Sequence, residues 1–299
     1  MIQIIGAGAI GCLWLAKLRQ VNYECHLVSR SQLISPRVKL TDLTGHKHLI
    51  EISHSNQLLH SSEKAQKSTI LVCVKAQQVL KALLMQRQYI SDQQPLILMH
   101  NGFGCAEEVI KHFPNNPIIC ATTANASLYN NALDITETGN GPSYFGLFKE
   151  TADDLSPLII PFQRAMKSVY WSESIIEKCW LKLAINAAIN PLTAIHQIKN
   201  GALQSIKYQS IITPLIKEVA TISEYENINL NLDILEKTIM EVIKATAENF
   251  SSMNRDIFYK RETEIDFING YLIKKAQQHK IVTPLLMNLY QQVKAMESH

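Results

Sequence analysis

A run of glycines directly after the first apolar segment constrains the fold more than any other feature. Ile2-Gln3-Ile4-Ile5 has the pattern of a short buried strand, and Gly6-Ala7-Gly8-Ala9-Ile10-Gly11 follows it and opens a helical pattern. In such a unit the first glycine permits the tight turn, the second lets backbone N–H groups approach a pyrophosphate, and the third lets helix and strand pack closely. The motif therefore predicts dinucleotide binding, with a merely tight turn as the alternative.

Short apolar runs alternate with helical patterns up to about residue 170. Near-continuous apolar runs are typical of strands buried on both faces of a parallel sheet. They occur at Ile2–Ile5, Cys25–Val28, Thr69–Val74, Leu96–Met99 and Ile118–Ala121. Helical patterns lie between them at Ala9–Gln20, Ala76–Gln86 and Cys105–Phe113. This alternation predicts an α/β fold with an open, doubly wound sheet of the Rossmann type.

A more β-like stretch follows the last of these runs. Leu133–Thr138 and Ser143–Leu147 are separated by the turn-forming residues Gly139-Asn140-Gly141-Pro142. Because such residues between two strand-like runs favour a hairpin, we expect an antiparallel hairpin added to the sheet.

Strand patterns end near Ser174, and long helical patterns take over. These cover Ile175–Asn190, Tyr208–Glu226, Leu232–Glu248, Thr263–His279 and Pro284–Ala295. The change of pattern, between residues 166 and 174, predicts a dinucleotide-binding Rossmann-type domain over 1–170 and an all-helical substrate domain over 171–299. A crevice between two such domains is a common site for small ligands.

Composition excludes several other classes of function. The net charge of +3 is scattered along the chain, so no basic block indicates nucleic-acid binding. The six cysteines show no metal-ligand spacing, and we expect no metal and a reducing cytoplasmic environment. No apolar run reaches the length of a membrane span, and the N-terminus lacks the features of a signal peptide.

The residues after the second predicted strand indicate which dinucleotide is bound. NAD enzymes typically carry Asp or Glu there, whereas this chain has Ser29-Arg30-Ser31. A guanidinium beside two hydroxyl groups suits a 2′-phosphate, so we expect NADPH, bound through Arg30. A solvated surface role for Arg30 is the alternative. FAD enzymes share the glycine motif but usually need a longer chain.

Two further polar segments follow buried strands. Val74-Lys75-Ala76 and His100-Asn101-Gly102 come at the carboxyl ends of the next two predicted strands. In an open parallel sheet that edge faces the ligand, so both segments are predicted to lie near the bound molecule.

The stretch from Trp180 to Pro191 is a helix-like run that is apolar except for Lys182, Asn186 and Asn190. Polar groups four residues apart form one stripe, and buried polar groups need partners. The stripe is therefore a candidate site for a small polar ligand, and we expect the helix to break at Pro191. Structural alternatives remain, because Asn before Pro is an ordinary helix terminator and a lysine can extend its ammonium group to the surface.

A second polar cluster spans residues 248–270. It contains three residues of the types that cap helices, at Ser251, Ser252 and Thr263. Glu264 or Asp266 would also favour a helix N-terminus, so a structural interpretation is open. The functional interpretation requires this cluster to lie near Lys182, where a carboxylate would keep the ammonium group protonated and oriented as a proton donor.

Taken together, these motifs resemble those of the ketopantoate reductase (2-dehydropantoate 2-reductase) family, in order and over essentially the whole chain. The resemblance rests on Gly6–Gly11, Val74-Lys75, His100-Asn101-Gly102, Lys182–Asn186, Asn190–Ala194, Ser251-Ser252-Met253 and Thr263–Gly270. The glycine motif is generic, whereas the Lys-x-x-x-Asn-x-x-x-Asn-Pro stripe and the Glu-Ile-Asp segment are specific to the family. The resemblance implies a helical C-terminal domain of the 6-phosphogluconate dehydrogenase type.

The resemblance also implies the reaction and the residues that carry it out. The family reduces 2-dehydropantoate to (R)-pantoate with NADPH, a step toward pantothenate and coenzyme A. By this likeness Lys182 is the proton donor, and Glu264 anchors either that lysine or the cofactor end of the cleft. Asn101 is expected beside nicotinamide and substrate. Cofactor contacts are assigned to Lys75 and Ala126, and substrate contacts to Asn186, Asn190, Asn249 and Ser252, with Asn200 as a weaker addition.

One segment departs from the family pattern. Many relatives carry Thr-Thr-His-Ala-Ala or a glycine-containing variant after the fifth strand, whereas this chain has Thr122-Thr123-Ala124-Asn125-Ala126. The backbone role expected of Ala126 is compatible with this change, whereas the resemblance predicts no side-chain contact for the segment.

Two other functions stay open at the level of sequence. A reductase of the same architecture acting on another 2-oxo or hydroxy acid is the first, although enzymes of the 3-hydroxyisobutyrate dehydrogenase type normally lack the Asn-x-x-x-Asn-Pro pattern after their lysine. A non-catalytic NADPH sensor is the second, and the presence of Lys182, Asn101 and Glu264 argues against it. The helical half is also a candidate surface for a homodimer.

Overall fold

The computed structural model describes residues 1–30, 35–149 and 151–297, and the chain forms two compact units. Unit 1 comprises Met1–His100 and Cys105–Ile175, and unit 2 comprises Asn101–Gly104 and Ile176–His299. The short loop 101–104 therefore belongs by its contacts to the helical unit, which the sequence did not predict. The division into functional domains at residues 170/171 stays a prediction.

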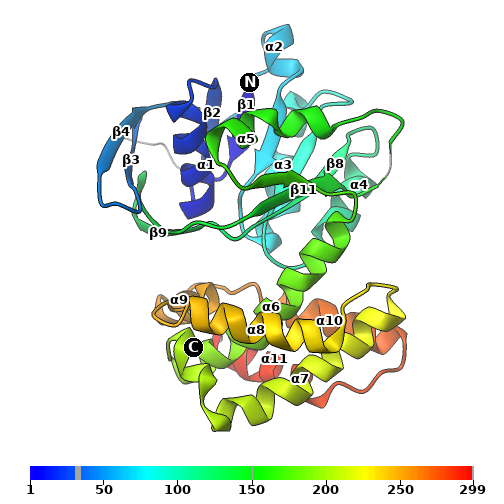
Figure 1. Cartoon of the computed structure of the whole chain (residues 1–299). Helices are drawn as coiled ribbons and strands as arrows, with labels where there is room; N and C mark the ends of the chain where they lie inside the picture. Colours follow the sequence, from blue (N-terminus) through cyan, green and yellow to red (C-terminus); the bar gives the residue numbers. More distant parts are fainter. Residues whose placement is uncertain (31–34, 150, 298–299) are drawn as a thin grey trace. The chain divides into compact units, whose positions relative to one another are not determined.

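Unit 1 is built on an eight-stranded sheet with the order β12-β11-β8-β7-β6-β1-β2-β5 (Figure 1). Its strands are β1 (Ile2–Ile5), β2 (Cys25–Val28), β5 (Ser53–Ser55), β6 (Thr69–Val72), β7 (Leu96–Met99), β8 (Ile118–Thr123), β11 (Ser143–Leu147) and β12 (Val169–Trp171). The six strands from β5 to β8 in this order pair in parallel, and β11 is antiparallel to β8. The predicted doubly wound sheet is confirmed, and its strand order reverses between β1 and β6.

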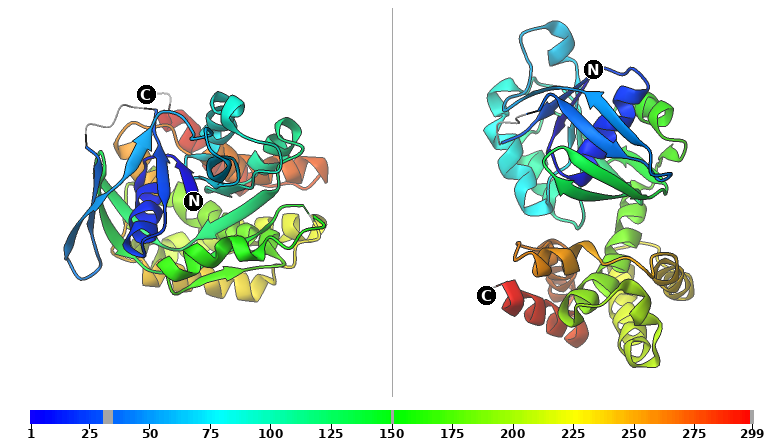
Figure 2. Two further views of the ribbon diagram at one scale, coloured as in Figure 1. Left: turned by 90° about the horizontal axis from the view of Figure 1, so that it is seen from above. Right: turned by 90° about the vertical axis from the view of Figure 1, so that its left-hand side faces the viewer.

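A second sheet of four strands, in the order β4-β3-β10-β9, completes unit 1. It consists of β3 (Arg37–Thr41), β4 (Lys47–Glu51), β9 (Ala126–Asn131) and β10 (Asp134–Gly139). Strands from the start and the middle of the chain lie side by side in it, because β10 pairs in parallel with β3 (Figure 2). Of its four strands the sequence patterns indicated only β10, as Leu133–Thr138, and neither β4 nor β9 contains a buried residue that would mark it as a strand.

The predicted hairpin between Leu133–Thr138 and Ser143–Leu147 is wrong. β10 pairs with β9 and β3 in the small sheet, whereas β11 pairs with β8 and β12 in the large one. The Gly139–Pro142 segment is a crossing between the two sheets, and the N–H group of Ala124 donates to the carbonyl oxygen of Pro142 at 2.8 Å. Turn-forming residues mark a change of direction, but the strand partners are set by tertiary packing.

Helix α1 (Ala9–Gln20) is buried on most of its surface because both sheets contact it. Leu13, Trp14 and Leu15 are fully buried, and Trp14 packs edge-on against Phe145 and Phe162. A helix that is apolar nearly all round requires such a position. The remaining helical segments of unit 1 are α2 (Glu63–Gln66), η1 (Ala76–Gln78), α3 (Val79–Met85), η2 (Arg87–Tyr89), α4 (Cys105–His112), η3 (Ser156–Ile159) and α5 (Ile160–Ala165).

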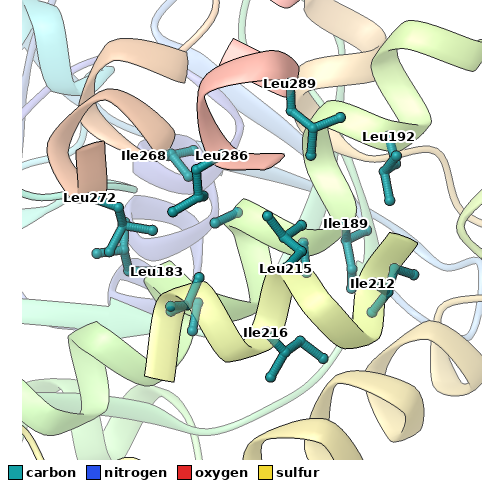
Figure 3. Close-up of a cluster of buried hydrophobic side chains, with 14 of the residues drawn as sticks. Leu183, Ile189, Leu192, Ile212, Leu215, Ile216, Ile268, Leu272, Leu286 and Leu289 are labelled. Carbon is teal, nitrogen blue, oxygen red and sulfur yellow. The ribbon is translucent and has the colours of Figure 1, made fainter. Parts of the chain in front are cut away.

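Unit 2 is helical around one apolar core. Its segments are α6 (Ile175–His196), η4 (Asn200–Gln204), α7 (Ile206–Tyr225), α8 (Leu232–Ala245), α9 (Ser252–Phe258), η5 (Ile265–Phe267), α10 (Asn269–Gln278) and α11 (Pro284–Glu297). Figure 3 shows side chains of α6, α7, α10 and α11 converging, among them Leu183, Leu215, Leu272 and Leu286. No helix in the described ranges is both long and apolar enough to cross a membrane.

The predicted break at Pro191 is wrong, because α6 continues through the proline to His196. A proline inside a helix costs about 3 kcal/mol relative to alanine. Leu192 and Ala194, which follow it, are almost fully buried in the core of unit 2, and this burial offsets the cost. The helix therefore extends past the polar stripe of Lys182, Asn186 and Asn190. Asn190, the last residue of that stripe, lies within regular helix and not at a helix end.

Candidate functional site

The glycine loop between β1 and α1 shows why each glycine is needed. Gly6 has φ +116°, and a Cβ atom there would lie 2.5 Å from the carbonyl oxygen of Cys73. A Cβ at Gly11 would overlap the carbonyl oxygen of Gly6. Gly8 differs, because a Cβ there would meet no atom within 4 Å. The first and third glycines therefore serve packing, and the second leaves open space beside the N-terminus of α1.

The first turn of α1 suits an anion. Gly8 is its N-cap residue and no acidic side chain lies in the first turn. Ala7, Ala9 and Ile10 stand beside Gly8 in the loop and the first turn, where the leading N–H groups of a helix have no partner within it. Helix N-termini of this kind attract phosphate groups.

The other residues predicted to bind the cofactor in unit 1 follow strands at the same edge of the large sheet. Arg30 is exposed after β2, Lys75 is partly buried after β6, and Ala126 begins β9, shortly after β8. Because β2, β1, β6, β7 and β8 are adjacent and parallel, their carboxyl ends share one edge. Ser31, the third residue of the predicted phosphate-binding triplet, lies outside the described residues.

The departure from the family pattern has a structural role in this chain. Asn125 is buried, and its Nδ2 donates to the hydroxyl oxygens of Thr123 and Ser143, each at 3.0 Å. Its Oδ1 accepts from the backbone N–H of Gly141 at 3.2 Å. The amide therefore joins the end of β8 to β11 and to the crossing between the sheets, and it fixes the backbone that leads to Ala126.

In unit 2, Lys182 lies on α6 in surroundings that lower its pKa. Burial is the main cause of this lowering, and the neighbouring Cys179 and Glu264 act in the opposite direction. Burial also raises the pKa of the Cys179 thiol to about 12, so that this group is uncharged near neutral pH. Glu264 is therefore the carboxylate that counteracts the desolvation of the ammonium group.

Glu264 brings a third segment of the chain into this cluster. Asn101 Nδ2 donates to Glu264 Oε2 at 2.9 Å, and the N–H of Phe103 donates to the carbonyl oxygen of Phe267 at 2.8 Å. Gly102, with φ +80°, permits this approach, since a Cβ there would lie 2.5 Å from the same oxygen of Phe267. The loop after β7 is thus fitted against the Glu264 segment by its backbone as well as by its amide.

Aromatic side chains also hold the loop 101–104 against α6 and α10. Phe103 packs against Trp180 and Tyr271, with ring centroids 5.8 and 5.3 Å apart. Trp180 and Tyr271 also contact each other, at 6.0 Å. Trp180 precedes Lys182 by two residues on α6, so these rings hold the lysine-bearing turn beside α10 and the loop 101–104.

The predicted substrate residues occupy neighbouring parts of unit 2. Asn186 and Asn190 follow Lys182 at intervals of one helical turn on α6, and Asn190 is buried. Asn249 and Ser252 are exposed around the start of α9. Asn200 is different, because its Nδ2 is committed to the hydroxyl of Thr246 at 2.9 Å.

Thr193 and Asn254, neither of which was predicted as a site residue, hold these parts together. Thr193 Oγ1 lies 2.7 Å from Ser251 Oγ, and Asn254 Nδ2 donates to the carbonyl oxygen of Thr193 at 2.7 Å. Ser251 also caps α9 by accepting from the N–H of Asn254. The capping interpretation of Ser251 is confirmed, and the same contacts place the start of α9 beside the turn that follows Asn190.

Cys179 and Phe103 are further residues of the cluster that sequence reasoning missed. Cys179 precedes Lys182 on α6 by three residues, a spacing that places two side chains on one helical face. The three-residue spacing could have identified Cys179 as a neighbour of Lys182. The contacts of Phe103 are with distant segments of the chain, and no local sequence pattern indicates them.

Two family models match the chain. The model described as "Ketopantoate reductase PanE/ApbA" matches residues 2–150, and the model described as "Ketopantoate reductase PanE/ApbA C terminal" matches residues 174–297. The matches therefore extend over both units.

Similar proteins and solved structures match the chain over nearly its whole length. The 2-dehydropantoate 2-reductase of Vibrio cholerae is 36% identical over 296 residues, which are 99% of this chain and 97% of that protein. The solved structure of a PanE/ApbA family ketopantoate reductase from Ralstonia eutropha JMP134 has a TM-score of 0.89 at 22% identity and covers 100% of this chain and 99% of its own. A D-mandelate dehydrogenase structure with NADH and anilino(oxo)acetate has a TM-score of 0.87 at 22% identity, with the same coverage. At this identity the two structures show a common fold alone.

Proposed function

Because the chain belongs to the ketopantoate reductase PanE/ApbA family, we propose that it reduces 2-dehydropantoate to (R)-pantoate with NADPH, toward pantothenate and coenzyme A. One observation carries the proposal beyond family membership. The carboxylate of Glu264 accepts a hydrogen bond from Asn101 at 2.9 Å and opposes the lowering of the Lys182 pKa, so three distant segments meet around one candidate proton donor.

The residues of unit 1 fit a dinucleotide phosphate. The open space at Gly8 admits a pyrophosphate close to the backbone, and the N-terminus of α1 carries no acid that would repel it. Arg30 would hold the 2′-phosphate, and Lys75 and Ala126 would line the same sheet edge. When bound, NADPH supplies the hydride for the C2 ketone of the substrate.

Lys182 acts as the proton donor in this proposal. Negative charge develops on the ketone oxygen as the carbonyl carbon is reduced, and an ammonium group beside that oxygen stabilises the charge and then donates its proton. Burial lowers the pKa of Lys182, which makes the proton easier to transfer, while Glu264 limits that lowering and keeps the group charged before the reaction. Asn101, held by Glu264, is oriented beside the same oxygen.

The remaining polar groups orient the substrate. Asn186 and Asn190 extend the stripe that begins at Lys182, and Asn249 and Ser252 stand around the start of α9. Amide and hydroxyl groups of this kind bind a carboxylate and a hydroxyl group, the two polar features of 2-dehydropantoate besides its ketone. Asn200 contributes less, since only its Oδ1 is without a hydrogen-bond partner in the described chain.

Another 2-oxo acid is the competing substrate, because the D-mandelate dehydrogenase structure shares this fold. A substrate panel separates the two. We expect kcat/KM with NADPH to be at least about 100-fold higher for 2-dehydropantoate than for 3-methyl-2-oxobutanoate, which lacks only the hydroxymethyl group. Phenylglyoxylate serves as the control for an aromatic 2-oxo acid. Equal kcat/KM values across the panel would contradict the proposed substrate.

A further inference from the structure

We propose that helix α11 is a positioning element for Glu264, an inference that rests on the role proposed above for Glu264 and Lys182. Three side chains of α11, those of Tyr290, Lys294 and Glu297, contact the segment Thr263–Phe267 that carries Glu264. Together these three residues form the α11 clamp.

The Glu264 segment needs anchors outside itself. Glu264 precedes the short η5 turn and residues 261–263 have no regular structure, so no helix or strand fixes the backbone on its N-terminal side. On one side the loop 101–104 contacts the segment, through Asn101 Nδ2 to Glu264 and the N–H of Phe103 to Phe267. The α11 clamp supplies the other anchor.

Glu297 holds the residue that precedes Glu264. Its Oε1 accepts from the backbone N–H of Thr263 at 2.7 Å, and its Oε2 pairs with Lys294 Nζ at 2.8 Å. Burial raises the pKa of Glu297, but the hydrogen bonds from Lys294 and Thr263 outweigh burial and lower it overall. The carboxylate is therefore ionised near neutral pH, and its bond to the backbone is charge-assisted.

Asp266 is held two residues after Glu264. The hydroxyl of Tyr290 donates to Asp266 Oδ1 at 2.7 Å, and Lys294 Nζ donates to Asp266 Oδ2 at 3.0 Å. Lys294 thus bridges the carboxylates of Asp266 and Glu297 and connects the two contacts that the α11 clamp makes with the Glu264 segment.

The two contacts of the α11 clamp, one to Asp266 and one to the N–H of Thr263, differ in strength. The side chains of Asp266 and Lys294 are 45% and 37% exposed, and ion pairs so accessible to water contribute little. The side chain of Glu297 is only 10% exposed, so its bond to Thr263 is better shielded. Glu297 is consequently the residue of the clamp on which the position of Glu264 depends most.

The decisive variant is Glu297→Ala. With the anchor on Thr263 removed, Glu264 moves away from Lys182, and we expect kcat for 2-dehydropantoate to fall about tenfold while the KM for NADPH stays within about twofold of wild type. The pKa of Lys182, followed by NMR of 13C-labelled lysine, is expected to shift in the same direction as in Glu264→Gln but by less. Glu297→Gln keeps an acceptor for the Thr263 N–H and is expected to restore most of the activity.

Glu218→Ala is the matched control. Glu218 caps the opposite end of α11 by accepting from the N–H groups of Leu285 and Leu286, each at 2.9 Å. Its loss destabilises the helix but is expected to leave kcat and the Lys182 pKa unchanged. A Glu297→Ala protein with a lower melting temperature but wild-type kcat and Lys182 pKa would overturn the inference.

Two further outcomes are distinguishable. If Glu297→Ala does not fold, Tyr290→Phe with Lys294→Met removes the Asp266 anchor and is judged by the same two measurements, with a smaller expected shift. If the wild-type protein does not reduce 2-dehydropantoate, the proposed function fails. The NMR titration still decides whether the α11 clamp positions Glu264 against Lys182.

Discussion

The glycine loop of unit 1 and the lysine cluster of unit 2 are assembled in different ways. The loop is made of consecutive residues, Gly6 to Gly11, and the atoms that leave no room for a Cβ at Gly6 and Gly11 are chiefly backbone atoms of Cys73 and of Gly6 itself. The cluster joins Lys182 of α6 with Glu264 and with Asn101, which come from three separate segments and meet through side chains. A motif of consecutive residues can be identified from the sequence alone. A cluster of residues from separate segments depends on every helix and loop that positions its members.

The glycine loop and the lysine cluster also differ in the chemical groups on which their functions depend. Backbone N–H groups at a helix N-terminus attract phosphate without the help of a particular side chain, so the loop indicates a class of cofactor. The lysine cluster depends on the charge of one carboxylate and on the burial of one ammonium group. We therefore expect variants of unit 1 to change cofactor binding and variants of unit 2 to change turnover.

Among substitutions of residues other than Lys182, Gly102→Ala is expected to have the largest effect. The new Cβ would lie 2.5 Å from the carbonyl oxygen of Phe267 at a residue with φ +80°, which forces the loop away from Glu264. We expect kcat to fall about 100-fold with retention of the fold. Gly45→Ala is the control, because Gly45 has φ +86° but open space around it, and its kcat should match wild type.

The pH dependence of kcat tests the charge of the cluster. A proton donor must be protonated, so kcat is expected to fall as pH rises through the lowered pKa of Lys182. In Glu264→Gln the stabilising negative charge is lost, the pKa falls further, and the alkaline limb moves to lower pH, with kcat at neutral pH reduced about tenfold. An alkaline limb that stays in place would show that Glu264 does not act on Lys182.

Arg30→Ala tests the cofactor side of the comparison. Loss of a charged hydrogen bond to the 2′-phosphate is expected to raise the KM for NADPH about tenfold and to leave the KM for NADH nearly unchanged, with little effect on kcat. Steady-state kinetics with both cofactors provide the measurement. Parallel changes in the two KM values would contradict the phosphate role.

Asn125→Ala is expected to have the smallest effect on activity. It removes the bonds to Thr123, Ser143 and Gly141 within unit 1 and should cost about 1–3 kcal/mol in free energy of unfolding. Thermal unfolding should show a lower melting temperature, with kcat close to wild type. Asn130→Ala, which removes exposed hydrogen bonds on β9, is the control and should change stability less.

Prediction from sequence succeeded where local rules decide the structure. Helix α1 has the predicted bounds, Ala9–Gln20, because strand, glycine turn and helix are contiguous. The predicted break at Pro191 failed because the burial of Leu192 and Ala194 offsets the cost of the proline. The predicted hairpin failed because β10 and β11 find partners in different sheets.

The candidate site divides in the same way. The spacing of Lys182, Asn186 and Asn190 on one helix was predictable because helical periodicity is local. The bond between Asn101 and Glu264 joins residues 163 positions apart, and no local rule predicts such a pair. The family resemblance predicted that Asn101 and Glu264 belong to the site, and the structure shows the hydrogen bond between them.

Lys182→Ala tests the central claim most directly when turnover and cofactor binding are measured on the same preparation. With Lys182 as the proton donor, we expect a loss of kcat for 2-dehydropantoate of about 100- to 10,000-fold, with the Kd for NADPH unchanged. Lys274→Ala, which removes an exposed lysine of α10, should match wild type in both quantities. Unchanged turnover in Lys182→Ala, or a loss of NADPH binding equal to the loss of turnover, would contradict the role of Lys182 as the proton donor.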